Sequence, residues 1–146
     1  DLPGTKLVVG DGPAAGALQS KYPAAVFTGY RFGEELAKHV ACADVFVFPS
    51  RTDTFGLVLI EAMACGVPVA AYPVTGPIDV VANGVTGVLS EDLQAAALAA
   101  LKLDRDACRE HALRYTWDAA THQFIATLTP VRDVAGASIC RVAAPS

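Results

Sequence analysis

The sequence predicts an α/β domain with a doubly wound parallel sheet, covered by helices on both faces and followed by C-terminal helices. The predicted strands are short apolar runs without polar alternation, which is typical of strands buried on both faces. Segments of helical length separate these runs, as parallel strands require. Most of the runs end at glycine or proline, which are the residues that favour turns.

The elements follow in alternating order. The runs that predict strands are residues 6–10 (KLVVG), 25–28 (AVFT), 44–49 (DVFVFP), 67–72 (VPVAAY) and 88–89. Helices are expected over residues 13–21, 34–43, 55–65, 77–82, 91–102, 104–114 and 117–128. Residues 130–146 are small and lack periodicity, so we expect a binding domain over 1–129 and then a tail or an arm that packs on a partner domain.

Composition limits the classes of function. The chain has 146 residues, of which 53% are hydrophobic and 18% charged, which is typical of one globular domain with a real core. Its formal net charge of -4 argues against a nucleic-acid surface, which needs a basic stripe. A phosphate ligand stays compatible with this charge, because backbone amides bind phosphate without net positive charge.

Neither the cysteines nor the histidines show the spacing of a metal site. We therefore expect no metal and no cofactor, and we interpret Cys42 and Cys65, which lie in apolar runs, as small core residues in a reducing compartment. The residues concerned are Cys42, Cys65, Cys108, Cys140, His39, His111 and His122. Without an apolar stretch of membrane-spanning length or a signal peptide, we expect a cytoplasmic protein that is at most peripheral to a membrane. The abrupt start, which enters a strand almost at once, is expected of a cut inside a longer protein.

The segment 49–73 (PSRTDTFGLVLIEAMACGVPVAAYP) is the most informative for chemistry. Its helix is apolar around Glu61, so we expect this carboxylate to be buried and to need a partner. That partner is either a protein amide or arginine, or a pair of ligand hydroxyls. The helix start near Thr54 or Phe55 favours a phosphate, Gly56 lets the backbone come close, and Glu61 lies about 6–9 Å farther along. This offset favours a nucleotide whose ribose hydroxyls meet Glu61.

Asp53 precedes this helix and allows two interpretations. It is either a plain N-cap or an acceptor for hydroxyls of a sugar on the far side of the phosphates.

These motifs resemble retaining glycosyltransferases of the GT-B class, specifically family 4, the glycosyl transferases group 1. The resemblance covers about 6–125 and implies one Rossmann-like half of a GT-B fold. It rests on Asp53-x7-Glu61, on Glu61 to Val69 (EAMACGVPV), and on Val9 to Pro13, Phe27 to Tyr30, Ala43 to Ser50, Gly76-Pro77 and Asn83 to Gly87. The stretch 70–92 is similar to bacterial GDP-mannose-dependent α-mannosyltransferases.

The resemblance implies roles for individual residues. Asp53 and Glu61 would be the catalytic pair, with Asp53 on sugar hydroxyls and Glu61 on the ribose. The amides of Phe55, Gly56 and Leu57 would contact the donor sugar and phosphates. The full set of implied donor-binding residues is Gly10, Asp11, Gly12, Gly29, Tyr30, Arg31, Ser50, Thr54, Phe55, Gly56, Leu57 and Glu61. Arg31 would lie beside the base, although a lone arginine is equally compatible with a surface charge.

Two departures from the family pattern affect the expected activity. The first acid of the family's motif is usually glutamate, whereas this chain has the shorter Asp53. The family's phosphate-binding arginine and lysine, and its N-terminal domain, lie upstream of the first residue here. The resemblance therefore implies the donor-binding domain of an enzyme that transfers a hexose from a GDP- or UDP-linked sugar, inactive in transfer by itself because donor and acceptor must be held together.

Three other functions make different demands on the sequence. A non-catalytic nucleotide or sugar-phosphate module would keep Glu61 and need no second domain. A GT-B-fold epimerase would use other acids than the pair with this spacing. A response-regulator-like domain would need an acidic cluster after the first strand and a late lysine, but only Asp11 is present.

Overall fold

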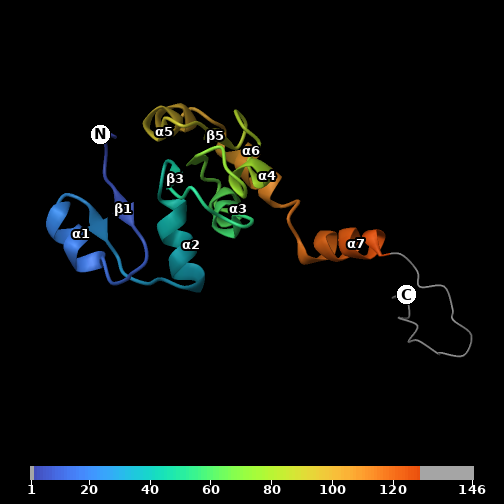
Figure 1. The fold of residues 1–146 in the computed structure, drawn as a ribbon, viewed down its shortest axis with the longest axis horizontal. Coiled ribbons are helices and arrows are strands. Elements are labelled where there is room, and N and C mark those ends of the chain that lie inside the picture. Colours follow the sequence, from blue (N-terminus) through green and yellow to red (C-terminus); the bar gives the residue numbers. More distant parts are fainter. Residues whose placement is uncertain (1, 129–146) are drawn as a thin grey trace, which may run out of the picture. The chain divides into compact units, whose positions relative to one another are not determined.

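The computed structural model describes residues 2–128, which form five strands and seven helices, alternating until the last three helices follow one another (Figure 1). The strands are β1 (Leu7–Val8), β2 (Val26–Phe27), β3 (Phe46–Phe48), β4 (Val69–Ala71) and β5 (Gly87–Leu89). The helices are α1 (Ala15–Lys21), α2 (Gly33–Ala41), α3 (Leu57–Ala64), α4 (Pro77–Val80), α5 (Leu93–Ala100), α6 (Arg105–Ala112) and α7 (Trp117–Thr127). Every predicted element is present, and most are shorter than the run that predicted them.

All strand pairs are parallel, as predicted, but they belong to two sheets. One sheet pairs β1 with β2, and the other has the order β3-β4-β5. Within residues 2–128 no ladder joins β1 to β3, so the doubly wound arrangement is divided at this point.

One edge of β1 and one edge of β3 pair with no other strand among residues 2–128. The amides of Val26 and Thr28 bond to Lys6 and Val8 at 2.8 and 3.0 Å, so alternate residues of β1 point to β2. Leu7 and Val9 therefore point their backbone groups the other way. On β3, Phe46 bonds to Pro68 of the β4 side at 2.8 Å, which leaves Val45 and Val47 facing outward. Within the described range 2–128, the outward-facing N–H and C=O groups of these four residues have no hydrogen-bond partner.

The edge of β5 is closed by its own turn. The amide of Gly84 donates to the carbonyl of Gly87 at 2.7 Å, and the amide of Leu89 donates to Asn83 Oδ1 at 2.9 Å. The three-stranded sheet thus has one protected edge and one open edge, at β3.

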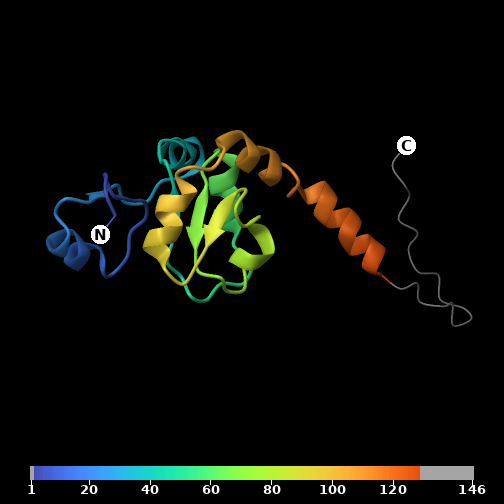
Figure 2. The same ribbon diagram turned by 90° about the horizontal axis from the view of Figure 1, so that it is seen from above.

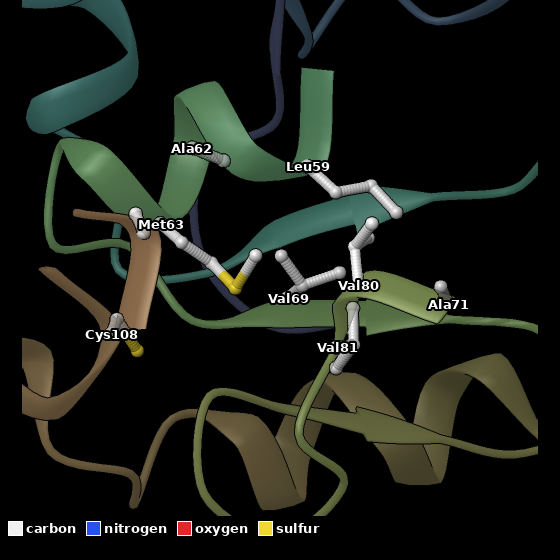
Figure 3. Close-up of a cluster of buried hydrophobic side chains, with 9 residues drawn as sticks. Leu59, Ala62, Met63, Val69, Ala71, Val80, Val81 and Cys108 are labelled. Atoms are coloured by element: carbon white, nitrogen blue, oxygen red, sulfur yellow. The ribbon is translucent and has the colours of Figure 1, made fainter. Parts of the chain in front are cut away.

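The core surrounds β4, which is the central strand of this sheet. Val69 and Ala71 face a cluster with α3, α4 and α6, whereas Ala70 faces α5, as the twofold alternation of a strand requires. Figure 3 shows the first cluster, in which Leu59, Ala62 and Met63 of α3 meet Val80 and Val81, with Cys108 of α6 beside Met63. The second cluster consists of Ala70, Ala96, Ala97 and Ala100. Both faces of this sheet are covered, as Figure 2 also shows, and the prediction of a helix-sheet-helix arrangement is confirmed.

The cysteines differ from the sequence-based interpretation at one position. Cys108 is fully buried and Cys65 is half-buried, but Cys42 is exposed because it caps the C-terminal end of α2. The pKa of the Cys108 thiol is raised, because burial disfavours the thiolate.

Helix α7 belongs to a second compact unit that begins at Thr116. Thr116 caps it, since its Oγ1 accepts from the amide of Ala119 at 3.0 Å. The expected tail at 130–146 lies outside the described residues. Among the described helices, none has the length and apolar character needed to cross a bilayer.

Candidate functional site

The turn between β3 and α3 carries Asp53, whose two carboxylate oxygens have different surroundings. Oδ1 accepts a hydrogen bond from the amide of Thr54 at 2.7 Å. Oδ2 is buried, and no residue of the described range 2–128 gives it a hydrogen-bond partner. A buried carboxylate oxygen without a donor costs free energy, so this atom is the strongest candidate in the turn for a ligand contact.

Gly76 lies against the Asp53 side chain. A Cβ on Gly76 would lie 3.1 Å from Asp53 Cβ and 3.3 Å from Asp53 Oδ2, and Gly76 has φ of +93°. Its amide donates to Asp79 Oδ2 at 3.1 Å, which fixes the start of α4. Glycine is therefore required here both by conformation and by the space that Asp53 occupies.

The N-terminus of α3 is open to an anion. Gly56 is its N-cap with φ of +85°, and no side chain caps the helix. The amide of Leu59 bonds back to Gly56 at 2.9 Å, whereas the amides of Leu57 and Val58 have no acceptor within residues 2–128. Free amides at a helix start favour a phosphate, so the prediction from the sequence has a physical basis here.

The expected burial of Glu61 is wrong. Helix α3 buries only Leu59, Ala62 and Met63, while Glu61 is exposed and Leu57 is 66% exposed. The reason is geometric: the helix packs one face on the sheet and on α6, and its apolar residues outside this face stay in solvent. Glu61 therefore needs no partner for its own stability.

The carboxylate of Glu61 is nevertheless unoccupied by the protein. No residue of the range 2–128 forms a hydrogen bond or an ion pair with its side chain. The interpretation in which a protein amide or arginine is the partner of Glu61 needs such a bond. Glu61 lies four residues after Leu57, about 6 Å along the helix axis. The helix on which the predicted spacing depends is therefore present, and the ribose and phosphate roles stay predictions.

A hollow of about 510 Å³ adjoins Asp53, lined by Arg51, Thr52, Asp53, Pro73, Val74, Thr75 and Ile78. Arg51 is held at its rim by two contacts. Its Nη1 donates to Glu91 Oε2 at 2.9 Å, and its guanidinium lies 3.9 Å from the centroid of the Tyr72 ring. The hydrogen bond to Glu91 raises the pKa of Arg51 above its ordinary value. Arg51 is not among the residues predicted for the site. Its partners Tyr72 and Glu91 are distant in sequence, so no local pattern marks the three as neighbours.

Ser50 and Thr54 stabilise the turn itself. Ser50 Oγ donates to the carbonyl of Thr52 at 2.7 Å, and the Thr54 amide is the donor to Asp53. Both predicted donor-binding residues therefore have local partners.

The second predicted group follows β1 and β2. Gly10 and Gly29 meet directly, with the amide of Gly10 donating to Gly29 at 2.9 Å. Asp11 Oδ1 accepts from the amide of Gly12 at 2.7 Å, which shapes the turn after β1.

The aromatic end of this group is exposed. Tyr30 stacks on Phe32 with ring centroids 6.1 Å apart, and Arg31 donates to the carbonyl of Tyr30 at 2.9 Å. This group belongs to the β1-β2 sheet, and the described residues record no hydrogen bond from it to the Asp53 turn.

No side-chain group among residues 2–128 has three potential metal ligands together. The sequence-based expectation that the site uses no metal stays a prediction.

Comparison with known families gives one match that covers most of the described chain. A family described as "Glycosyl transferases group 1" matches residues 5–106. GDP-mannose-dependent alpha-mannosyltransferase of Corynebacterium glutamicum is 47% identical over 83 residues, which cover 57% of this chain and 20% of that protein. D-inositol 3-phosphate glycosyltransferase of Geodermatophilus obscurus is 40% identical over 104 residues, which cover 66% of this chain and 23% of that protein.

A plant protein and two solved structures are also similar. Sulfoquinovosyl transferase SQD2 of Arabidopsis thaliana is 39% identical over 129 residues, with 77% of this chain and 25% of that protein covered. Sucrose-phosphate synthase from Thermosynechococcus elongatus has a TM-score of 0.66 at 31% identity and covers 82% of this chain and 36% of that chain. Anabaena HepE, solved with UDP and glucose, has a TM-score of 0.69 at 23% identity, and the match covers 86% of this chain and 41% of that chain. At this identity the similarity concerns the fold alone.

Proposed function

Because this chain belongs to the glycosyl transferases group 1 family, we propose that it is the donor-binding part of a retaining family 4 glycosyltransferase that takes a hexose from a nucleotide-diphosphate sugar. The names of the relatives support this class of reaction, and the HepE structure holds UDP and glucose. The chain spans about a fifth to a quarter of the length of the curated relatives it matches, so the reaction is proposed for a longer protein.

The buried Oδ2 of Asp53 is the observation that supports the proposal most. No group of residues 2–128 donates to this oxygen, and Asp53 is one of the residues that line the hollow. The χ2 torsion of an aspartate is soft, so the carboxylate can turn toward a hydroxyl in that hollow. A sugar hydroxyl would then supply the missing hydrogen bond, and Asp53 would hold the transferred hexose.

The diphosphate would bind at the start of α3. The amides of Leu57 and Val58, which have no acceptor among residues 2–128, and the helix dipole favour negative charge at this point. During transfer the bond between the anomeric carbon and the β-phosphate oxygen breaks, and the nucleoside diphosphate leaves with an added negative charge. The same amides would stabilise that charge as it develops, which lowers the barrier.

Glu61 would bind the ribose. Its carboxylate is exposed and has no partner among residues 2–128, and it lies about one turn after the proposed phosphate site. A carboxylate can accept from both vicinal hydroxyls, so a ribose fits this position. The stretch 70–92 and the named mannosyltransferase relatives favour GDP-mannose, with UDP-glucose as the other donor to be tested.

Transfer would need chain beyond residues 1–146. In a doubly wound sheet of order 3-2-1-4-5-6, consecutive strands proceed outward from a central strand in both directions. We propose that the β1-β2 pair and the β3-β4-β5 sheet are the two outer parts of such a sheet, so that a further strand would lie between β1 and β3. The unpaired backbones of Leu7, Val9, Val45 and Val47 would flank a further parallel strand there.

The N-terminal domain would supply the acceptor site, and the chain around that further strand would supply the expected arginine and lysine. We propose that the complete site needs no metal. We therefore propose that residues 1–146 bind the donor weakly and do not transfer sugar. The three described cysteines are free, which favours a reducing compartment and thus a cytoplasmic protein or one at the membrane surface.

The test is a calorimetric and thermal-shift comparison of GDP, UDP, ADP and their sugar conjugates on the 146-residue chain. We expect one diphosphate to stabilise the parent and Glu61→Ala to abolish the response. Glu110→Ala is the matched control, because Glu110 is exposed and has no recorded side-chain partner among residues 2–128. A chain that binds no nucleotide, or a Glu61→Ala variant that binds as the parent does, contradicts the proposal. Tight GDP binding together with a gene that encodes no acceptor domain would favour the non-catalytic module.

A further inference from the structure

Val80, the last residue of α4, contacts both the start of α3 and the end of α6. Its side chain approaches Gly56 so closely that a Cβ on Gly56 would lie 3.3 Å from Val80 Cγ2. Its carbonyl accepts a hydrogen bond from His111 Nε2 at 2.9 Å and from the Tyr115 hydroxyl at 3.4 Å. Since a carbonyl can only accept, His111 carries its proton on Nε2.

Tyr115 makes a second contact to the same turn, through its ring. The rings of Phe55 and Tyr115 meet edge to face with centroids 6.5 Å apart, and the His111 ring lies 5.6 Å from that of Tyr115. Phe55 is 46% exposed, and the ring of Tyr115 is one of the neighbours that cover the rest of its side chain.

The turn before α3 is thus restrained from two sides. Helix α4 lies with Gly76 at its start against Asp53 and with Val80 at its end against Gly56. His111 and Tyr115 in turn hold the carbonyl of Val80, and Tyr115 holds Phe55. Both residues lie near the end of α6, in the same compact unit as the turn, and neither borders the hollow at Asp53.

We infer that Tyr115 and His111 are positioning residues that set the orientation of the Phe55–Gly56–Leu57 turn for the donor phosphates. This inference rests on the proposed donor site, but its first part concerns the ligand-free protein. Loss of the Tyr115 ring would let Phe55 and the adjoining amides move, and phosphate binding needs those amides aligned.

The experiment compares Tyr115→Leu with Tyr115→Phe, which keeps the ring, and His111→Leu with His111→Gln, which keeps an N–H donor. The two readouts are the backbone amide chemical shifts of residues 55–57 without ligand, and the affinity for the nucleoside diphosphate that the parent binds. We expect both leucine variants to move the amide signals and to weaken binding about 2- to 10-fold, the range that corresponds to one aromatic pair. The conservative variants should stay close to the parent on both readouts.

The matched controls are Tyr22→Leu, at the exposed C-cap of α1, and His39→Leu, at a half-exposed position of α2. If Tyr115→Leu moves the amide signals of 55–57 no more than Tyr22→Leu does, the inference is overturned. Moved signals with unchanged affinity also overturn it, because the orientation would then not matter for binding. A parent chain that binds no nucleotide contradicts the proposed function instead, and the chemical shifts still decide whether Tyr115 positions the turn.

Discussion

The side chain of Asp53 occupies the space that a Cβ on Gly76 would need, at 3.1 Å from Asp53 Cβ. This contact links the loop after β4 to the turn after β3. Gly76 follows Asp53 by 23 residues in the sequence (76 − 53). It also helps to bury Asp53 Oδ2, the oxygen that has no partner within the described residues. A buried oxygen without a donor lowers stability, and under the proposed function a sugar hydroxyl would supply the missing hydrogen bond.

Substitution of Gly76 by alanine is expected to disturb this contact. We expect Gly76→Ala to lower the free energy of unfolding by about 2–3 kcal/mol, from left-handed backbone strain and from crowding of Asp53. Gly84→Ala is the matched control, because Gly84 has φ of +80° but open space around its Cβ position. Urea unfolding of both variants isolates the contact, and equal destabilisation of the two would contradict it.

Exposure of Glu61 leads to a prediction about the ligand-free chain. Glu61→Ala should change the free energy of unfolding by less than about 0.5 kcal/mol, because the carboxylate is solvated and unpartnered. Thermal unfolding without nucleotide measures this, with Glu110→Ala as reference. A large change in either direction would mean that Glu61 has a partner in the folded chain.

Arg105 is expected to stabilise the contact between α2 and α6. Its Nη1 and Nη2 donate to the carbonyls of Ala43 and Ala41 at 2.8 and 3.0 Å, at the end of α2. Arg105→Ala should cost about 1–3 kcal/mol, since both bonds involve a charged donor. Arg114→Ala, which also removes one exposed positive charge, should be nearly neutral in the same denaturation experiment.

The thiol of Cys108 should react slowly with an alkylating reagent and Cys42 quickly. Cys108 is buried, and burial raises the pKa of its thiol, so the thiolate is scarce in the folded protein. As the pH rises, the thiol ionises first in the unfolded chain, where its pKa has the ordinary value. The contribution of this thiol to stability is therefore complete below that ordinary pKa, and it is lost as the pH rises through the raised pKa of the folded protein. Mass spectrometry of iodoacetamide-treated protein, with and without urea, measures the two rates. Equal labelling of Cys42 and Cys108 in the native protein would refute the assigned burial.

The order of elements could be read from local pattern. The runs 44–49 and 67–72 predicted β3 and β4 because unbroken apolar stretches of that length fit a strand buried on both faces. Gly56 and Gly76 stand where positive φ is needed, and the glycines themselves are visible in the sequence.

The tertiary structure decided which acid is buried and how the strands pair. Glu61 lies in an apolar stretch but on the open side of α3, whereas Asp53 lies in a polar stretch but under Gly76. Burial depends on which neighbours cover a side chain, and those neighbours, from α4 and α6, are distant in sequence. The division between the β1-β2 and β3-β4-β5 sheets has the same origin, because a strand can bond across an edge only to a chain segment that is there.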